Sequence, residues 1–258
     1  MNYGMYLSAT GIRASSYRQD VIANNLANAE TVGFKRNHAA FHERLNEAME
    51  RNEPMSQDKL FAPMSGGLLA SPTQIDFSQG TIDQTGNNLD LAIQGQGFFA
   101  VQSEKGTKVT RSGQFMLDRE GYLITSNETA DKVLDPKGKT IQLGGYRASQ
   151  LSIGTDGTVH DSASRAVINQ VGLFDVTDRN QLMKSPGNVF TAENLDASLK
   201  PATEARVRSG YIEGSNVDPT HELTQLMDAQ RQLEANANMI RYQDQAMGKL
   251  VNEVGKIS

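Results

Sequence analysis

Residues 223–254 read LTQLMDAQRQLEANANMIRYQDQAMGKLVNEV, and counting alternately by three and four from the first Leu gives a single seam. The seam positions are Leu223, Leu226, Gln230, Leu233, Ala237, Ile240, Asp244, Met247, Val251 and Val254. Only Gln230 and Asp244 interrupt its apolar character. A narrow heptad stripe is typical of a helix that packs on other helices. The stretch therefore predicts a C-terminal helix that needs a helical partner.

The other end of the chain carries the same spacing. Its positions are Tyr3, Leu7, Thr10, Ala14, Tyr17 and Val21, followed by the polar Asn24 and Asn28. We expect a helix from about residue 3 to Ala29, with Gly33 free to take a left-handed conformation just beyond the helix end. The simplest partner for this helix is the C-terminal one, or copies of both helices from neighbouring molecules.

Composition excludes several classes of function. The 258 residues carry a net charge of −5, with scattered basic residues, which disfavours a nucleic-acid binder. The chain has no Cys, so disulfides, thiolate nucleophiles and Cys-based zinc sites are excluded together. No apolar run approaches the ~18 residues of a membrane span. The start lacks a basic region followed by an apolar block, so we expect no cleaved secretory signal.

Between the ends, the pattern predicts an α+β chain with an antiparallel β domain flanked by connectors. Helical spacing continues over residues 37–50, which completes an N-terminal helical segment 1–50. Residues 51–87 read as an extended connector with short strands near its end, and 88–190 as the central β domain, a sandwich or irregular barrel of many short strands. Residues 191–218 read as a second connector, and 219–258 as the C-terminal helix, which pairs with the N-terminal one.

The sequence offers no specific catalytic or cofactor site. His38 and His42 have the spacing of a helical metal-ligand pair, but Ala39 replaces the Glu of the zinc-protease pattern, so solvated helix residues are the better interpretation. Gly95-Gln96-Gly97 lacks the third Gly of a phosphate loop and precedes a strand, which favours a tight turn. We expect no enzyme activity, no cofactor and no metal.

Several short polar motifs stand out beside the predicted helices and strands. In chain order they are Ala23-Asn24-Asn25-Leu26-Ala27-Asn28 with Thr31-Val32-Gly33-Phe34-Lys35-Arg36, Asp90 through Phe99, Thr110-Arg111-Ser112-Gly113-Gln114-Phe115, Gly210 through Val217, and Met227 with Gln230-Arg231. This ordered set resembles the flagellar rod and hook family of bacteria. A single β domain resembles the intermediate class of that family, FlgF and FlgG, and the start of the chain and residues 213–216 resemble FlgF more.

The resemblance implies a structural subunit of the flagellar basal-body rod, whose terminal helices pair in the assembled tube and form the drive shaft across the periplasm. It implies self-assembly with other rod proteins and delivery by the flagellar export apparatus. From charge and hydropathy we expect no nucleic-acid partner and no membrane span. The residues that the seam and the motifs place in subunit assembly are Leu7, Ala14, Val21, Asn24, Asn25, Asn28, Gly33, Phe34, Leu223, Leu226, Gln230, Arg231, Leu233, Ala237 and Ile240.

Two other hypotheses stay open at this point. The chain could be a secreted trimeric module whose β domain recognises a cell-wall or glycan polymer, which would require exposed aromatic rings clustered on one sheet face. It could also be a hydrolase of cell-wall material, which would require a cleft holding paired carboxylates.

Overall fold

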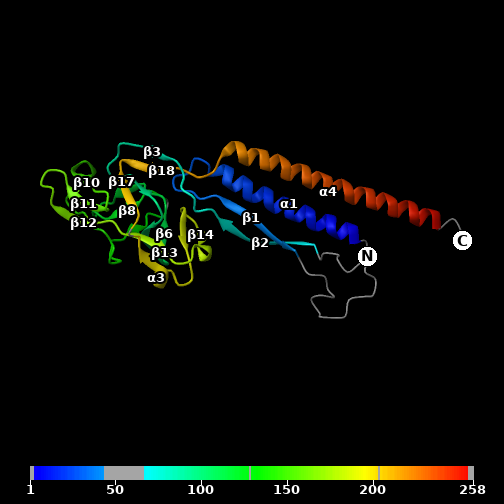
Figure 1. Cartoon of the computed structure of the whole chain (residues 1–258), viewed down its shortest axis with the longest axis horizontal. Coiled ribbons are helices and arrows are strands. Elements are labelled where there is room, and N and C mark those ends of the chain that lie inside the picture. Colours follow the sequence, from blue (N-terminus) through cyan, green and yellow to red (C-terminus); the bar gives the residue numbers. More distant parts are fainter. Residues whose placement is uncertain (1–2, 44–66, 128, 203, 255–258) are drawn as a thin grey trace. The chain divides into compact units, whose positions relative to one another are not determined.

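The computed structural model describes residues 3–43, 67–127, 129–202 and 204–254. The chain divides into two compact units. The helical unit comprises residues 1–27, 37–76 and 218–258, and the β unit comprises residues 28–36 and 77–217. Figure 1 colours the chain along its sequence, so the blue and red helices of the helical unit mark the two ends of the chain. No described helix is both long enough and apolar enough to span a membrane.

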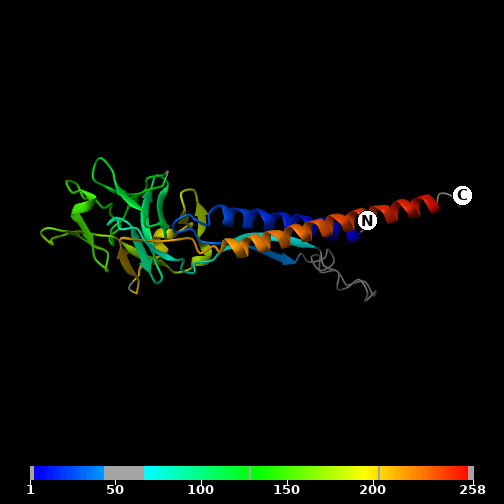
Figure 2. The ribbon, with the colours of Figure 1, turned by 90° about the horizontal axis from the view of Figure 1, so that it is seen from above.

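Two long helices and a strand pair build the helical unit. Helix α1 spans Tyr3–Ala27 and α4 spans Pro219–Val254, which confirms the two terminal helices. Figures 1 and 2 show them side by side. Gly4 of α1 lies against Gln243 of α4, and Gly11 lies against Asn236. The two helices therefore run antiparallel.

The faces that meet between α1 and α4 differ from the predicted apolar seam. On α1 the facing row is small: a methyl group added to Gly11 would lie 2.7 Å from the Asn236 Nδ2 atom, and Ser8 and Ser15 on the same row are buried. On α4 the row shares Leu226, Leu233 and Ile240 with the prediction. Its other members are Glu222, Ala229, Asn236 and Gln243. Small side chains on α1 let the two backbones approach closely, as a row of Leu could not.

Residues 37–43 correct the predicted helix over 37–50, because they form strand β1 (Asn37–Glu43), which pairs with β2 (Leu68–Ile75). The predicted residues 44–50 lie outside the described part of the chain. Asn25 of α1 explains the start of the strand: its Nδ2 donates to the Asn37 carbonyl at 2.9 Å, and its Oδ1 accepts from the Asn37 N–H at 2.9 Å. These two bonds hold the Asn37 backbone extended, so tertiary contacts override an Ala-rich segment's helix propensity.

The β1–β2 hairpin packs on the row of α1 that the sequence predicted to be apolar. Tyr17 meets Phe41 edge to face at 6.0 Å between ring centroids, and its hydroxyl donates to the Ser71 carbonyl at 3.3 Å. Val21, on the same row, is buried. An isolated two-stranded hairpin is marginally stable in water. The predicted α1 seam therefore stabilises this hairpin, while a neighbouring row of the helix contacts α4.

The β unit consists of many short strands. They are β3 (Ile82–Gln84), β4 (Leu91–Gln94), β5 (Phe98–Ser103), β6 (Gly106–Thr110), β7 (Phe115–Leu117), β8 (Leu123–Thr125), β9 (Lys132–Val133), β10 (Leu151–Ile153), β11 (Thr158–Asp161), β12 (Val167–Gln170), β13 (Leu173–Val176), β14 (Met183–Ser185), β15 (Val189–Thr191), β16 (Leu199–Pro201), β17 (Arg206–Ser209) and β18 (Tyr211–Glu213). Short helical turns lie at η1 (Ala148–Gln150), η2 (Arg179–Gln181) and α3 (Leu195–Ser198).

Every pairing between these strands is antiparallel, which confirms the predicted antiparallel β region. The largest sheet has nine strands and runs β14-β15-β6-β5-β9-β8-β7, with β13 beside β5 and β16 beside β13. A three-stranded sheet runs β10-β11-β12, and two further pairs join β17 to β4 and β18 to β3. Turns at 118–121 and 155–157 connect β7 to β8 and β10 to β11, with Gly121 and Gly157 at positive φ.

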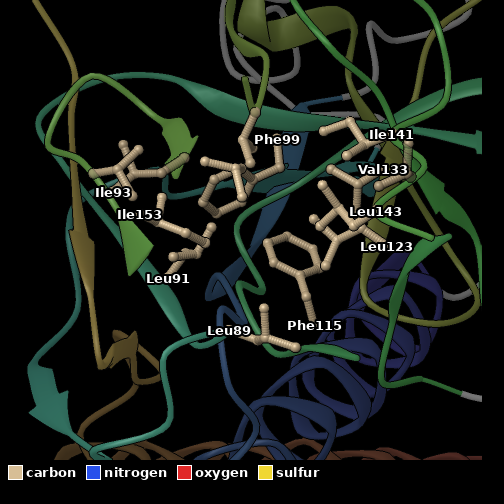
Figure 3. Close-up of a cluster of buried hydrophobic side chains, with 14 of the residues drawn as sticks. Leu89, Leu91, Ile93, Phe99, Phe115, Leu123, Val133, Ile141, Leu143 and Ile153 are labelled. Atoms are coloured by element: carbon tan, nitrogen blue, oxygen red, sulfur yellow. The ribbon is translucent and has the colours of Figure 1, made fainter. Parts of the chain in front are cut away.

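The core lies mainly on one side of strand β5, as Figure 3 shows. Phe99 faces this core and meets Phe115 edge to face at 5.1 Å, surrounded by aliphatic side chains. The labelled members are Leu89, Leu91, Ile93, Phe99, Phe115, Leu123, Val133, Ile141, Leu143 and Ile153. Phe98 is also buried and packs against Phe77 and Phe190. Because β5 is buried on both faces, its sequence is a continuous apolar run rather than an alternating one.

Both predicted connectors contain strands, which the sequence predicted only near the end of 51–87. Within 51–87 lie β2 and β3, and within 191–218 lie β16, β17 and β18. Strand β17 pairs with β4 along its whole length, and Val207 belongs to the core. Residues 191–217 are therefore part of the β unit and not a linker, because β16 pairs with β13, and β17 and β18 pair with strands more than a hundred residues earlier in the chain.

This pairing predicts that a fragment of residues 77–217 unfolds cooperatively and that a fragment of residues 88–190 does not. The shorter fragment lacks β17 and Phe77, so the unpaired edge of β4 and one face of Phe98 become exposed. Thermal unfolding followed by circular dichroism checks the expectation. Equal, sharp transitions for the two fragments would show that the later strands add nothing to the core.

Candidate functional site

The residues predicted for assembly divide between the two units. On the helices, Val21 and Asn25 are buried; Leu7, Ala14, Leu226, Leu233, Ala237 and Ile240 are half-buried; and Asn24, Leu223, Gln230 and Arg231 are exposed. In the β unit, Asn28 is half-buried, and Gly33 and Phe34 are buried. The apolar residues predicted from helical spacing lie in the helical unit, whereas Asn28, Gly33 and Phe34, which belong to the first motif, lie in the β unit.

Asn25 organises the helical unit from within. Besides its two bonds to the Asn37 backbone, its Nδ2 lies 3.4 Å from the Oε2 of Glu222, a fully buried carboxylate in the first turn of α4. One amide side chain therefore contacts the start of β1 and the start of α4 from near the end of α1. The three Asn of the predicted motif are not equivalent, since Asn25 is buried whereas Asn24 is exposed.

The motifs of the β unit converge on the carboxylate of Glu213, which has no exposed surface. Lys35 donates to its Oε1 atom at 2.5 Å, and Arg111 donates from Nη1 to its Oε2 atom at 3.0 Å. The Gly80 N–H also donates to Oε1, at 3.1 Å. We call Lys35, Arg111 and Glu213 the ionic cluster. Each member comes from a different sequence motif.

The two cations of the ionic cluster have further partners. Lys35 also donates to the Ser78 carbonyl at 2.7 Å. Arg111 donates from Nη2 to the Gly95 carbonyl at 2.9 Å and lies over the ring of Phe98, 5.4 Å from its centroid. Burial lowers the pKa of the Arg111 guanidinium, and the nearby Glu213 carboxylate opposes this shift. Such a buried pair is tolerated because nearly every charged atom has a hydrogen-bonding partner.

Gly33 and Phe34 lie beside the ionic cluster and fit it tightly. Gly33 has φ +68°, and a methyl group there would collide with the backbone N of Ser112. Its N–H donates to the Glu213 carbonyl at 2.7 Å. The Lys184 ammonium lies 3.6 Å from the Phe34 ring centroid and donates to the Lys35 carbonyl. Burial lowers the pKa of Lys184 to about 8, while these two contacts favour its charged form.

Sequence reasoning quoted Lys35, Arg111 and Glu213 within motifs but did not single them out as a site. One signal was present, because each charged residue stands next to Gly or within two positions of it. What the sequence did not contain was their pairing. The members are separated by 102 residues (Arg111 to Glu213) and 178 residues (Lys35 to Glu213) along the chain.

Two sequence features were considered as small-ligand sites, the His38/His42 pair and Gly95-Gln96-Gly97, and local contacts explain both. His38 and His42 lie on a strand, where His38 Nε2 is 3.9 Å from Asp76 and His42 Nδ1 is 2.7 Å from the Ser71 hydroxyl. Within the described residues, no group of three or more His, Asp or Glu side chains could hold a metal ion. Gly95 and Gly97 form a tight turn between β4 and β5, both at positive φ.

Beside that turn lies a hollow of about 360 Å³ in the β unit, with a polar lining that includes Gln96, Asp175, Lys200 and Glu204. Arg179 donates to Asp175 at 2.8 Å and to the Gln96 side chain at 2.7 Å. The bond to Asp175 neutralises one carboxylate of the lining, and the two bonds together hold the Asp175 and Gln96 side chains in place. The arrangement provides no nucleophile held by a base and no cradle for a phosphate.

Gly33→Ala tests how closely residues 31–36 fit the β unit. The added methyl group adopts an unfavourable left-handed conformation, costing ~1–2 kcal/mol, and also meets the Ser112 backbone. Gly138→Ala is the matched control, because Gly138 has φ +75° with no atom within 4 Å. Chemical denaturation should show a clearly larger loss for Gly33→Ala. Equal losses would mean that the contact with Ser112 is not tight.

Glu213→Gln tests the ionic cluster. Removing one partner of a buried ion pair leaves the remaining charges uncompensated, so we expect a loss of about 3–5 kcal/mol in the free energy of unfolding. Glu193→Gln, at an exposed position of the same unit, should change stability little. Urea denaturation of both variants provides the comparison, and a small effect at position 213 would contradict the role given to the cluster.

Three family models match separate parts of the chain. Residues 5–35 match the model described as flagella basal body rod protein, residues 92–161 the flagellar hook protein FlgE/F/G D1 domain, and residues 208–253 the flagellar basal body rod FlgEFG protein C-terminal. Lys35, Arg111 and Glu213 each fall in a different one of these matches. The geometry of the ionic cluster therefore joins all three family segments.

Whole-chain relatives agree with these matches. The flagellar basal-body rod protein FlgF of Caulobacter vibrioides is 31% identical over 260 residues, covering 100% of both chains. The rod protein FlgG of Bacillus subtilis is 31% identical, covering 96% of this chain and 97% of its own. FlgG of Caulobacter vibrioides is 32% identical, covering 93% and 95%. With this similarity along its whole length, the chain belongs to the flagellar basal-body rod proteins of the FlgF/FlgG class.

Proposed function

We propose that this chain is a structural subunit of the bacterial flagellar basal-body rod, and that it polymerises through its terminal helices into the tubular drive shaft. Family membership supports the structural role. The observation that carries the assembly mode is the contact row of α4, which extends beyond its partner helix. In this proposal the chain acts through contacts with copies of itself and with other rod proteins, and not as an enzyme.

The contact row of α4 reaches its last α1 partner at Gln243, which lies against Gly4 near the start of α1. The same heptad spacing continues to Met247 and Leu250. Their side chains are 43% and 59% exposed, and Val251 beside them is 68% exposed. Exposed apolar side chains that continue a helix–helix seam past its last contact with the described part of α1 are suited to pair with a helix of another subunit.

Other apolar side chains also lie on the outside of α4. Leu223, Met227, Met239 and Tyr242 are all exposed, and none lies on the row that faces α1. A helix with apolar residues on more than one face requires more than one neighbour. Contacts that do not close on themselves generate a helical filament, which is the form a rod requires. This arrangement supports the proposed coiled-coil-like pairing of the terminal helices with neighbouring subunits.

The proposal includes a place in the cell. Rod relatives support a location in the flagellar basal body, and we further propose the periplasmic part of the rod, reached through the flagellar export apparatus. Within the class, the start of the chain and residues 213–216 favour the proximal-rod member FlgF. Whole-chain identity is similar for FlgF and FlgG relatives, at 31% for the examples from Caulobacter vibrioides and Bacillus subtilis.

The glycan-binding alternative receives no support from the relatives, which are rod proteins. Two tyrosine rings that could have bound a glycan are partly covered by cationic side chains. Lys132 lies 3.7 Å from the ring centroid of Tyr122, and Arg208 lies 4.2 Å from that of Tyr211. The hydrolase alternative would need a free carboxylate pair, whereas Asp175 of the hollow is paired with Arg179. Both alternatives are set aside.

Leu250→Asp tests the proposed assembly seam. Because Leu250 is exposed in the single chain, thermal stability should stay close to that of the parent. In a polymer the same carboxylate would be buried among apolar side chains, at a cost of several kcal/mol per subunit. Polymers seen by negative-stain electron microscopy at high concentration should therefore disappear, and motility of cells carrying the variant should fail.

Two comparisons make this test specific. Gln245→Asp places the same charge off the seam and should polymerise normally. Leu233→Asp lies on the row that faces α1, so it should destabilise the single chain as well as prevent assembly. Normal polymers formed by Leu250→Asp would show that the extended seam is not an assembly contact.

A further inference from the structure

Residues 31–36 are attached to the β unit in an unusual way. Their neighbours in sequence on both sides, residues 3–27 and 37–43, belong to the helical unit. Residues 31–36 form turns and a short irregular stretch and take no part in any strand ladder. Even so, Gly33, Phe34 and Lys35 are buried in the β unit. The segment therefore lies in the β unit as a bound peptide does.

The main chain of this segment is held by a series of hydrogen bonds. Asn188 donates from Nδ2 to the Val32 carbonyl at 2.6 Å, and Gly33 donates to the Glu213 carbonyl at 2.7 Å. Asn216 donates from its N–H to the Phe34 carbonyl at 3.4 Å and accepts with Oδ1 from the Arg36 N–H at 2.7 Å. Lys184 donates to the Lys35 carbonyl. These bonds run along five consecutive residues.

Three side-chain positions give the site its selectivity. Only Gly fits at position 33, because of its positive φ and the adjacent Ser112 backbone. Phe34 places its ring under the Lys184 ammonium. Lys35 reaches both the Glu213 carboxylate and the Ser78 carbonyl. The site thus reads a Gly, an aromatic residue and a Lys in succession.

The receiving carboxylate is oriented by groups of the β unit outside the segment. Arg111 donates to the Oε2 atom of Glu213. The Gly80 N–H donates to the Oε1 atom, which also accepts from Lys35. Arg111 is in turn fixed by the Gly95 carbonyl and the Phe98 ring. A binding group whose orientation does not depend on the ligand is preorganised, which favours binding of a separate peptide.

We propose that the β unit, residues 77–217, contains a peptide-binding site for a Gly-Phe-Lys segment, which the chain fills with its own residues 31–36. Glu213 recognises the Lys, and Lys184 and Asn188 hold the main chain. This site is distinct from the proposed assembly seam on α4, and its properties do not depend on polymer formation. Docking of the segment is a binding step that can be separated from folding of the β unit.

The test uses the full chain with Gly33→Val and Lys35→Met together, so that its own segment no longer fits. The probe is a synthetic peptide of residues 28–37, NAETVGFKRN. Isothermal titration should detect one peptide per double-variant chain and no binding to the parent chain, whose site is filled at the high effective concentration of a tethered segment. The same peptide with Lys35→Met should bind at least tenfold more weakly.

Each outcome of this experiment either supports or overturns the peptide-binding proposal. A double variant that keeps its cooperative thermal transition but binds no peptide overturns the proposal, as does equal binding of the peptides with Lys and with Met. If the double variant loses its transition, an excess of the native peptide should restore it. Failure of that restoration also overturns the proposal, whereas restoration by the native peptide and not by the Met peptide supports it.

Discussion

The carboxylate of Glu213, buried between Lys35 and Arg111, is the constraint on which the rest of the β unit depends. A charged group without exposed surface is tolerated only when opposite charges and hydrogen-bond donors surround it. Here those groups are Lys35 and Arg111, from two distant segments, and the Gly80 N–H. The ionic cluster is therefore complete only when residues 31–36 lie in the β unit, although the chain of this unit is discontinuous.

The helical unit is built on a different principle. Small residues of α1 face polar and aliphatic residues of α4, so the contact between these helices buries little apolar surface for its length. Helix pairs of this kind gain modest stability from burial, which scales with the apolar area removed from water. Several other large apolar side chains of α4, among them Met227, Met239 and Leu250, are exposed instead. In the proposed assembly these exposed side chains would contact neighbouring subunits.

The segment from Asn25 to Asn37 begins and ends in the helical unit and passes through the β unit between them. At one end, Asn25 fixes the Asn37 backbone in the helical unit; between them, residues 31–36 enter the β unit and supply Lys35 to the ionic cluster. The three family matches fall on the first helix with this segment, on the β strands, and on the later strands with α4. Each of the three family matches therefore contributes one member of the ionic cluster.

The sequence by itself determined the two terminal helices, most strands between residues 91 and 176, and the family, because helical periodicity, strand alternation and short motifs are local properties. Tertiary structure alone decided the rest. It chose which row of α1 faces α4, since rows one residue apart differ only in what packs against them. It made residues 37–43 a strand, since Asn25 and β2 hold their backbone extended. It paired Lys35 and Arg111 with Glu213, since a charge can be buried only where its partners are brought together by the folded chain.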